Sequence, residues 1–378
     1  MKVGIITFYR APNYGAMLQA YALYKYLTHS GHNVEFLAHP FCLQRPFTLL
    51  RCFISRHITG VRNKLANRVQ YSIVDFARRL PLSKKIDDYA QLSQLNNRYD
   101  AVIVGSDQMW NPMWCSNLGC IELLFLGFLD RRVIRLSYAA SFGTDQWPED
   151  DNRALRVGEL LQLFKGIGVR EASGVALVEK LSRRSDAVCT VDPTLLHDRS
   201  FYEGLLTDPG HCKPYIFKYI LNWSEDDAAD NVIRALCRKH AFDVLDDKER
   251  VRGALSIVCR MLSVRTKVSV GSWLGLINGA SYVVTNSFHG TVFSIIFHKA
   301  FVSLRIEGEM SGMNERLQTL LSRLGLADRF VSSSDEESIN RVVCSTIDWT
   351  KVDMRLNEWR MTSADFLAKN LMADDSCK

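Results

Sequence analysis

A histidine stands among small polar residues at position 289, between an apolar run at 281–285 and a second apolar segment at 291–298. The first run is rich in β-branched residues, which predicts a buried strand, and the second has the spacing of a helix. In parallel α/β sheets, ligands bind beyond the carboxyl ends of strands, where the following helix offers free N–H groups to an anion. An imidazole at this place could bind an anionic substrate or give it a proton. Alternatively, Asn286 or Ser287 caps the helix and His289 is an ordinary residue of its first turn.

The loop at 105–111 is crowded with hydrogen-bonding side chains and directly follows an apolar run at 101–104 that predicts a strand. Asp107 in this loop could accept a proton from a sugar hydroxyl. Ser106 and Gln108 beside it could bind the same substrate. Alternatively, Asp107 is a turn or capping residue, as Asp after a strand often is.

Arg170 follows another short apolar run, at 166–169. A guanidinium is a planar, permanently charged fork that suits carboxylate or phosphate. The adjacent Glu171 is compatible with a different interpretation, an ordinary surface ion pair. Taken together, His289, Asp107 and Arg170 supply an acid, a base and an anion clamp at three predicted strand ends. That combination suits group transfer from a small anionic donor.

The turn after the first predicted strand contains Asn13 and Gly15. It has one glycine where a dinucleotide fingerprint needs three, and the chain has no Walker lysine loop, so both nucleotide motifs are excluded. Asn13 and Gly15 could still shape a turn whose backbone meets a ligand. A purely structural turn is the equal alternative.

Alternating strands and helices must position these residues, as in a doubly wound parallel sheet formed twice along the chain. We expect a Rossmann-like domain over 1–195 on the acceptor side, a second over 196–350 on the donor side, and a C-terminal helix and tail over 351–378. A cleft would separate the two domains. The expected strands are at 3–8, 33–38, 101–104, 133–139, 166–169, 187–191, 215–221, 242–245, 281–285 and 301–304. The expected helices are at 15–29, 148–164, 173–182, 225–240, 272–279, 291–298, 314–324, 335–344 and 351–372.

The bulk composition fits this organisation. The chain has 378 residues, 47% of them hydrophobic and 23% charged, which is typical of a folded protein with two domains. Ten scattered cysteines without a Cys-x-x-Cys pair indicate neither a disulfide framework nor a zinc site, and they favour reduced cytoplasmic thiols. No apolar run approaches the ~20 residues that cross a bilayer, and the first residues predict a strand rather than a signal peptide.

The net charge of +6 is concentrated in the segment 45–85, which contains ten Arg and Lys residues and a single acidic residue, Asp75. These charges alternate with apolar residues at helical spacing, which predicts a basic helical insert. Such a helix can lie on anionic lipid headgroups. The alternative is an ordinary solvated basic face. Nucleic acid is disfavoured because no nucleic-acid module accompanies the charge.

In their order and spacing, the motifs of this chain resemble the polysaccharide pyruvyl transferase family. The resemblance spans about residues 3–330 and is carried by six segments, at 13–23, 104–111, 137–143, 169–171, 191–195 and 285–290. It implies two Rossmann-like halves around a cleft, as in type B glycosyltransferases. It also implies transfer of pyruvate from phosphoenolpyruvate to two sugar hydroxyls as a cyclic ketal, with release of phosphate and without a metal or redox cofactor. The implied setting is bacterial cell-surface polysaccharide synthesis, such as that of capsule or exopolysaccharide.

The resemblance also implies roles for individual residues. His289 matches the family histidine proposed to protonate the donor, and Arg170 matches an arginine that grips it. Asp107 is then the candidate base, and the further substrate-binding candidates are Asn13, Gly15, Ser106, Gln108, Asn286, Ser287, Gly290 and Thr291.

Two positions depart from the family pattern. Ser287 stands where some members have Arg, and Ala16 stands where some have Asp. The donor therefore needs another cation, for which Arg316 is the first choice, with Arg305 and Lys218 behind it. The remaining alternatives are a nucleotide-sugar-dependent glycosyltransferase and a non-catalytic carbohydrate-binding homologue. A lipid-linked acceptor would give the basic insert a reason to touch the inner face of the membrane.

Overall fold

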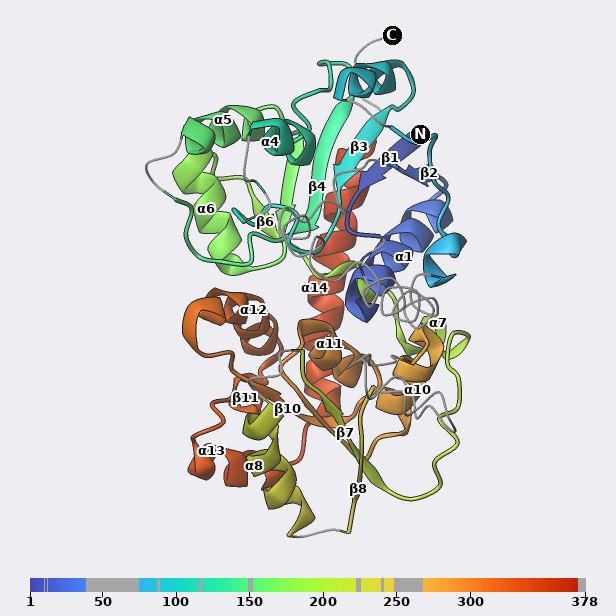
Figure 1. The fold of residues 1–378 in the computed structure, drawn as a ribbon. Coiled ribbons are helices and arrows are strands. Elements are labelled where there is room, and N and C mark those ends of the chain that lie inside the picture. Colours follow the sequence, from blue (N-terminus) through green and yellow to red (C-terminus); the bar gives the residue numbers. More distant parts are fainter. Residues whose placement is uncertain are drawn as a thin grey trace, which may run out of the picture.

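The computed structural model describes residues 1–9, 11, 13–38, 75–86, 89–113, 115, 118–148, 152–221, 226–238, 241–247 and 268–372. Within these ranges the chain forms two parallel β-sheets with helices packed around them, one in each half of the molecule (Figure 1). The first sheet consists of β1 (Lys2–Ile6), β2 (Asn33–Phe36), β3 (Ala101–Val104), β4 (Ile134–Ala140), β5 (Gly166–Val169) and β6 (Val188–Cys189). The second consists of β7 (Tyr215–Tyr219), β8 (Asp243–Leu245), β9 (Tyr282–Thr285), β10 (Ala300–Leu304) and β11 (Phe330–Val331). The expected fold class, α/β with two Rossmann-like halves, is confirmed.

The strand order of each sheet reverses once. In the first sheet the order is β2-β1-β3-β4-β5-β6, so the reversal lies between β1 and β3. In the second sheet the order is β11-β10-β9-β7-β8, so it lies between β9 and β7. Open α/β sheets bind ligands beyond the strand ends at such a reversal. The loop after β3 carries Asp107, and the first turn of the helix after β9 carries His289, so both lie where the topology favours a ligand site.

Strand residues alternate between two apolar layers of the first sheet, as the period of a strand requires. In β3, Ala101 and Ile103 belong to the core that contains α1 (Tyr14–His29), while Val102 and Val104 belong to a second core. Side chains of α4 (Leu118–Leu124), α5 (Asn152–Leu161) and α6 (Ala172–Ser182) complete the second core. Both faces of the sheet are therefore buried.

One apolar core is shared by the two halves. Leu18 in α1, Val292 in α11 (Phe288–Ile296) and Leu356 in α14 (Trp349–Asn370) all belong to it. The other α-helices of the second half, among the residues that the structure describes, are α8 (Asp226–Cys237), α10 (Val270–Gly279), α12 (Asn314–Leu324) and α13 (Glu336–Cys344), and α7 (Arg199–Glu203) lies in the connection. Because α1 and α11 pack in the same core, the ends of the two sheets are brought together.

The C-terminal helix α14 runs along both halves of the molecule (Figure 1). Near its start, the Trp349 ring stacks on His298 with 4.7 Å between ring centroids. Near its end, Asn370 packs so closely on β5 that a Cβ at Gly166 would lie 2.6 Å from its side-chain oxygen. The helix therefore joins the second half to the first sheet.

Several boundaries differ from the sequence expectation. The first strand ends at Ile6 rather than at residue 8, and α11 begins at Phe288 rather than at 291 because Ser287 caps it. Helix α4 and strand β11 were not expected, since each is too short to show a period.

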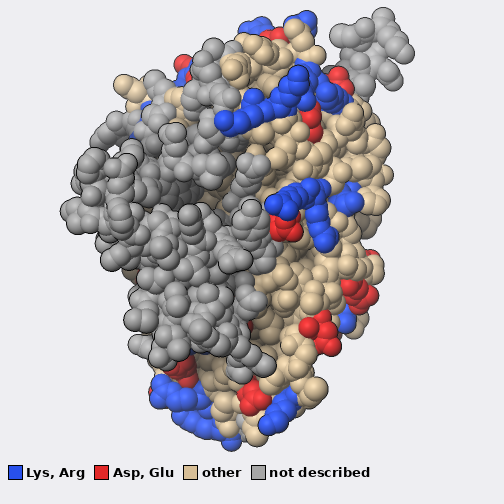
Figure 2. All heavy atoms as spheres, turned by 45° about the vertical axis from the view of Figure 1, so that its right-hand side comes forward, with Lys and Arg blue, Asp and Glu red and all other residues tan. Residues whose placement is uncertain are grey.

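Residues 45–74 of the basic insert expected at 45–85 lie outside the described residues. Its described end contains a short 3₁₀ helix, Ala77–Arg79. Elsewhere on the face shown in Figure 2, the described Lys and Arg side chains form separate groups with Asp and Glu near them. No helix among the described residues combines the length and apolarity needed to span a bilayer.

Candidate active site

His289 is the second residue of α11, immediately after the turn that follows β9. Ser287 is the N-cap of this helix, and its Oγ accepts a hydrogen bond from Gly290 N at 3.3 Å. Thr285 Oγ1 accepts one from Ser287 N at 3.0 Å, and a Cβ at Gly290 would lie 2.5 Å from that same oxygen. Hydrogen bonds between residues of the turn itself therefore fix its conformation. His289 is indeed a first-turn residue, yet its side chain is only 9% exposed and lies against Gly15 and Asp192 of the other half of the molecule.

The partner of His289 is a buried carboxylate, Asp192, which follows β6. His289 Nε2 lies 3.5 Å from Asp192 Oδ2. The other carboxylate oxygen, Oδ1, accepts hydrogen bonds from Thr194 N at 3.0 Å and from Thr194 Oγ1 at 2.6 Å. These bonds fix the orientation of the carboxylate, because Asp192 caps the short 3₁₀ helix Pro193–Leu196.

The protonation state of the Asp192 carboxyl group is set by its burial and by the charged groups around it. Burial by itself would raise the pKa of Asp192, but the facing His289 and Arg170 lower it by more. The resulting pKa is below the usual range for Asp. The carboxylate is therefore ionised and can stabilise a positive charge on His289.

The first helix of the chain contacts His289 directly. A Cβ added at Gly15 would overlap Nδ1 of the His289 ring, so only glycine allows the imidazole to approach α1 this closely. Asn13 caps α1, and its Oδ1 accepts hydrogen bonds from Gly15 N at 2.9 Å and from Ala16 N at 3.3 Å. Gly15 thus gives room to a side chain of the second half, and the contact of its backbone with a ligand stays a prediction.

Arg170 connects the acidic residues of the first half. Its Nη1 lies 3.0 Å from Asp192 Oδ2 and donates to Ser106 Oγ at 3.3 Å. Its Nη2 lies 3.6 Å from Asp107 Oδ1. Asp107 has a left-handed backbone with φ of 76°, a conformation that Asp tolerates better than most residues, and its side chain is 20% exposed. Asp107 therefore supplies a carboxylate of this group that solvent or a substrate can reach.

A second guanidinium, Arg316 of α12, approaches from the other half. Both arginines lie over the Phe288 ring, Arg170 at 4.6 Å and Arg316 at 5.8 Å from its centroid. With the Gln108 amide turned to satisfy its neighbours, its oxygen lies 3.3 Å from both terminal nitrogens of Arg316. Burial, and then the charge of Arg170, lower the pKa of Arg316 to about 10. The two cations thus repel one another in a space that largely excludes water.

Glu171 is fully buried, so the interpretation of a surface ion pair is wrong. Its Oε1 accepts hydrogen bonds from Phe142 N at 2.7 Å, Ser141 Oγ at 3.0 Å and Gly143 N at 3.2 Å. Burial raises the pKa of Glu171, against the opposing effect of Arg170 and Arg316. This carboxyl group organises the loop after β4 and faces the two cations.

Several buried polar atoms of this cluster have no hydrogen-bond partner among the described residues. They are Nε and Nη2 of Arg170, Oε2 of Glu171 and Nε2 of His289. Buried polar atoms are nearly always hydrogen-bonded in native proteins. Arg170 Nη2 and His289 Nε2 face carboxylates only at 3.6 and 3.5 Å, so these buried donors can still bind an anionic, hydrogen-bonding ligand.

The other predicted site residues have internal roles in the structure. Asn286 Oδ1 accepts a hydrogen bond from Leu221 N at 2.9 Å and so ties the ends of β7 and β9 together. Thr291 Oγ1 donates to Ser287 O at 3.1 Å and lies 2.6 Å from Ser303 Oγ. These side chains shape the turn that presents His289. Their direct contact with substrate stays a prediction.

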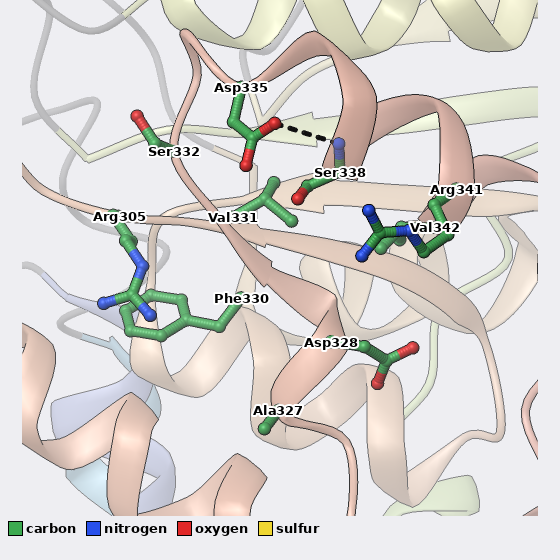
Figure 3. Close-up of a pocket in the computed structure, with 10 residues that line it drawn as sticks. All are labelled: Arg305, Ala327, Asp328, Phe330, Val331, Ser332, Asp335, Ser338, Arg341 and Val342. Carbon is green, nitrogen blue, oxygen red and sulfur yellow. Dashed lines mark hydrogen bonds between the residues drawn. The ribbon is translucent and has the colours of Figure 1, made fainter.

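Three cations were candidates for the charge that Ser287 cannot supply. Of these, only Arg316 lies in the His289 cluster, which consists of His289, Asp192, Arg170, Asp107, Glu171 and Arg316. Lys218 pairs with Asp230 at 3.0 Å. Arg305 stacks on Phe330 at 4.3 Å and lines a separate pocket of about 300 Å³ on the second half (Figure 3). None of the ten residues that line this pocket belongs to the His289 cluster.

Sequence reasoning assigned no role to Asp192 or Phe288. Asp192 stood inside one of the motifs, at 191–195, but its partner is 97 positions away in sequence and lies in the other half. No group of three or more His, Cys, Asp or Glu side chains in the described part of the chain is placed to hold a metal ion.

The comparison with protein families identifies the chain. The family model for polysaccharide pyruvyl transferase matches residues 13–308, a range that includes His289, Asp192, Arg170 and Asp107. The chain belongs to the polysaccharide pyruvyl transferase family. This family is one of transferases that act in polysaccharide synthesis. No curated protein matches the sequence significantly.

Solved structures of similar fold include two UDP-GlcNAc 2-epimerases and a MurG. The epimerase from Neisseria meningitidis, bound to UDP-GlcNAc, is 12% identical with a TM-score of 0.47, over 98% of this chain and 99% of that one. The epimerase from Methanocaldococcus jannaschii is 11% identical with a TM-score of 0.49, over 92% and 93%. MurG from Acinetobacter baumannii is 11% identical with a TM-score of 0.45, over 97% and 98%. At these scores the likeness carries no argument about the function of this chain.

Replacing Asp192 by Ala should destabilise the fold by about 3–5 kcal/mol at pH 7, because the buried Arg170 would lose the closer of its two ion partners. The pKa of Asp192 is lower in the folded chain than the value of about 3.9 in an unfolded one. Its contribution is therefore complete above that value and is lost as the pH falls through the folded pKa. Urea unfolding of both proteins from pH 7 down to pH 3 should show the difference shrinking.

The matched control is Asp130→Ala, which removes an exposed ion pair with Arg132 at 2.9 Å. Screening by solvent makes such pairs weak. Its loss of stability should be much smaller than that of Asp192→Ala. Equal losses for the two variants would contradict the central place of Asp192.

Proposed function

We propose that this protein transfers pyruvate from phosphoenolpyruvate to two hydroxyls of a sugar, forming a cyclic ketal and releasing phosphate. The observation that carries the proposal is the buried pair of guanidinium groups, Arg170 and Arg316, beside the pair formed by His289 and Asp192. The first pair suits a small dianionic or trianionic donor, and the second suits transfer of a proton to it. Both are needed for this chemistry.

The donor would lie across the interface of the two halves. Phosphoenolpyruvate carries a carboxylate and a phosphate, and each can take a bidentate guanidinium. Nε and Nη2 of Arg170 are buried without a hydrogen-bond partner among the described residues, and Arg316 is close enough to raise the local positive charge. Because Arg170 belongs to the first half and Arg316 to the second, we propose that both halves hold the donor. The acceptor would then enter beside Asp107 on the first half.

The chemistry begins with proton transfer from the His289 imidazolium to the methylene carbon of phosphoenolpyruvate. Positive charge develops at C2, and a sugar oxygen attacks C2 as its proton passes to Asp107. The second hydroxyl then forms a second C–O bond at C2 while the bond from C2 to the phosphate oxygen breaks. Phosphate leaves with the proton of the second hydroxyl, and the proton held by Asp107 replaces the one that His289 gave. The ionised Asp192 stabilises the imidazolium at the start of each cycle.

The same proposal gives the enzyme a setting. We propose a cytoplasmic protein of bacterial cell-surface polysaccharide synthesis, of capsule or exopolysaccharide, whose donor is phosphoenolpyruvate and which uses no further cofactor. The acceptor is a sugar or glycan that carries two suitably spaced hydroxyls.

Substitution His289→Ala should lower kcat by about 10²–10⁴-fold, the usual contribution of a general acid. The assay follows phosphate release from phosphoenolpyruvate and the mass gain of a pyruvyl ketal on candidate glycans. His29→Ala is the matched control, since His29 is exposed at the far end of α1 and bonds only the carbonyl of Lys25 in the described chain. Full turnover by His289→Ala would exclude the proposed acid.

Substitution Arg316→Met should raise the KM for phosphoenolpyruvate by about 10- to 100-fold, since a hydrogen bond to a charged group contributes about 1.5–3 kcal/mol. The control is Arg341→Met, which removes an exposed arginine of the separate pocket, paired with Glu337 at 2.9 Å. An unchanged KM in Arg316→Met would show that the donor anion is held elsewhere.

Two other results would replace the proposal. Nucleoside diphosphates that raise the melting temperature, in the absence of any effect of phosphoenolpyruvate, would favour a nucleotide-sugar-dependent glycosyltransferase. Binding of glycan or donor without release of phosphate would favour a non-catalytic carbohydrate-binding homologue.

We also propose that the basic segment 45–85 brings the enzyme to the inner face of the membrane, where a lipid-linked acceptor would lie. Ten basic residues against one acid supply the charge for this contact. The protein should sediment with vesicles that contain anionic lipid and not with neutral ones, and the binding should weaken as salt is added. Equal recovery in the supernatant with both vesicle types would remove this part of the proposal.

A further inference from the structure

The C-terminal helix α14 holds the residue just before Asp192. Ser363 is almost fully buried, and its Oγ accepts a hydrogen bond from Val191 N at 3.0 Å. The same hydroxyl donates to Trp359 O, one turn earlier in α14, at 2.7 Å. With its proton committed to the helix, the Ser363 oxygen is oriented to accept from Val191. The backbone that enters the Asp192 turn is therefore fixed by a side chain of α14.

A second side chain of α14 holds the other end of the same turn. Arg360 Nε donates to Leu195 O at 2.7 Å, and its Nη2 donates to His197 O at 3.4 Å. Burial lowers the pKa of Arg360, as expected for a guanidinium that leaves water to bind backbone carbonyls. Ser363 and Arg360 thus bracket the four residues from Asp192 to Leu195. Any displacement of the turn that carries the Asp192 carboxylate would break a hydrogen bond to Ser363 or to Arg360.

The same helix is attached to the segment that presents His289. His298 follows the end of α11, and its Nε2 lies 3.0 Å from Asp353 Oδ1 of α14. Arg355 of α14 also donates to Leu324 O at the end of α12, at 3.0 Å. Helix α14 therefore binds both the Asp192 turn of the first half and the α11 and α12 helices of the second.

We infer that α14 sets the distance between Asp192 and His289 across the interface, with Ser363 and Arg360 as positioning residues for the proton transfer. Neither side chain contacts His289 in the described structure. Each acts through the Asp192 turn. The inference rests on the proposed function for its kinetic test, and a second readout below does not need turnover.

Substitution Ser363→Ala should lower kcat about 5- to 20-fold and leave the KM for phosphoenolpyruvate within twofold, because the two arginines that hold the donor are not touched. The loss corresponds to one ordinary hydrogen bond. Thr362→Ala is the matched control, because the Thr362 hydroxyl donates to the same carbonyl of Trp359 at 2.9 Å and does not reach Val191. Ser363→Thr, which keeps the hydroxyl, should restore most of the lost kcat.

A double substitution separates positioning from general loss of stability. In an Asp192→Asn background, Ser363→Ala should have little further effect on kcat, because the carboxylate whose position it sets is gone. A full additional loss in that background would overturn the inference. If Ser363→Ala does not fold, Arg360→Met carries the same test from the other end of the turn.

The independent readout is the titration of the His289 imidazole, followed by NMR in labelled protein without substrate. Asp192→Asn removes the facing charge and should move the titration midpoint to lower pH, and Ser363→Ala should move it part of the way in the same direction. Thr362→Ala should not move it. An unmoved midpoint in Ser363→Ala would overturn the positioning role. A shifted midpoint in a protein that releases no phosphate from phosphoenolpyruvate would instead leave the positioning role standing and refute the proposed function.

Discussion

The organisation of the site depends on one buried, ionised carboxylate, Asp192, that lies between a guanidinium and an imidazole. Taking a charged carboxylate out of water costs several kcal/mol unless good partners surround it. Arg170 on one side, His289 on another and the Thr194 hydroxyl and amide together meet that need. Since Arg170 and His289 come from different halves of the molecule, the same interaction that orients the histidine also closes the interface at this point.

The two guanidinium groups of the site are not equally matched by the described carboxylates, because Asp192 and Asp107 both pair with Arg170. Arg316 is buried and repelled by Arg170, and Glu171, a buried carboxyl that interacts with both arginines, is itself shifted toward its neutral form by burial. A protein tolerates such an imbalance where a ligand supplies the missing negative charge. Arg170 and Glu171 also have buried polar atoms without a hydrogen-bond partner among the described residues. Charge and hydrogen bonding therefore favour the same kind of ligand, a small polyanion.

The sequence predicted what depends on local pattern and missed what depends on contacts between halves. Strands β3, β5 and β9 were predictable because buried parallel strands are short apolar runs, and the polar loops after them stand out by contrast. The reason for Gly15 could not be found locally, since the ring that requires it belongs to residue 289. For the same reason Asp192 received no role, although it lies in a motif. Arg316 was chosen only because a cation was needed, and its position beside Arg170 supports that choice.

The capping role of Ser287 accounts for a second cation, Arg316, that comes from α12 and not from α11. The residue at 287 is the N-cap of α11, and its hydroxyl binds Gly290 N in the turn that presents His289. An arginine cannot accept that bond, so under the proposed function the side chain that caps this helix and the side chain that binds the donor are different residues. Phe288, next to the cap, provides a ring over which both Arg170 and Arg316 lie. The Phe288 ring attracts both guanidinium groups and so offsets part of the repulsion between them. Arg316 of α12 can therefore supply the positive charge that Ser287 lacks.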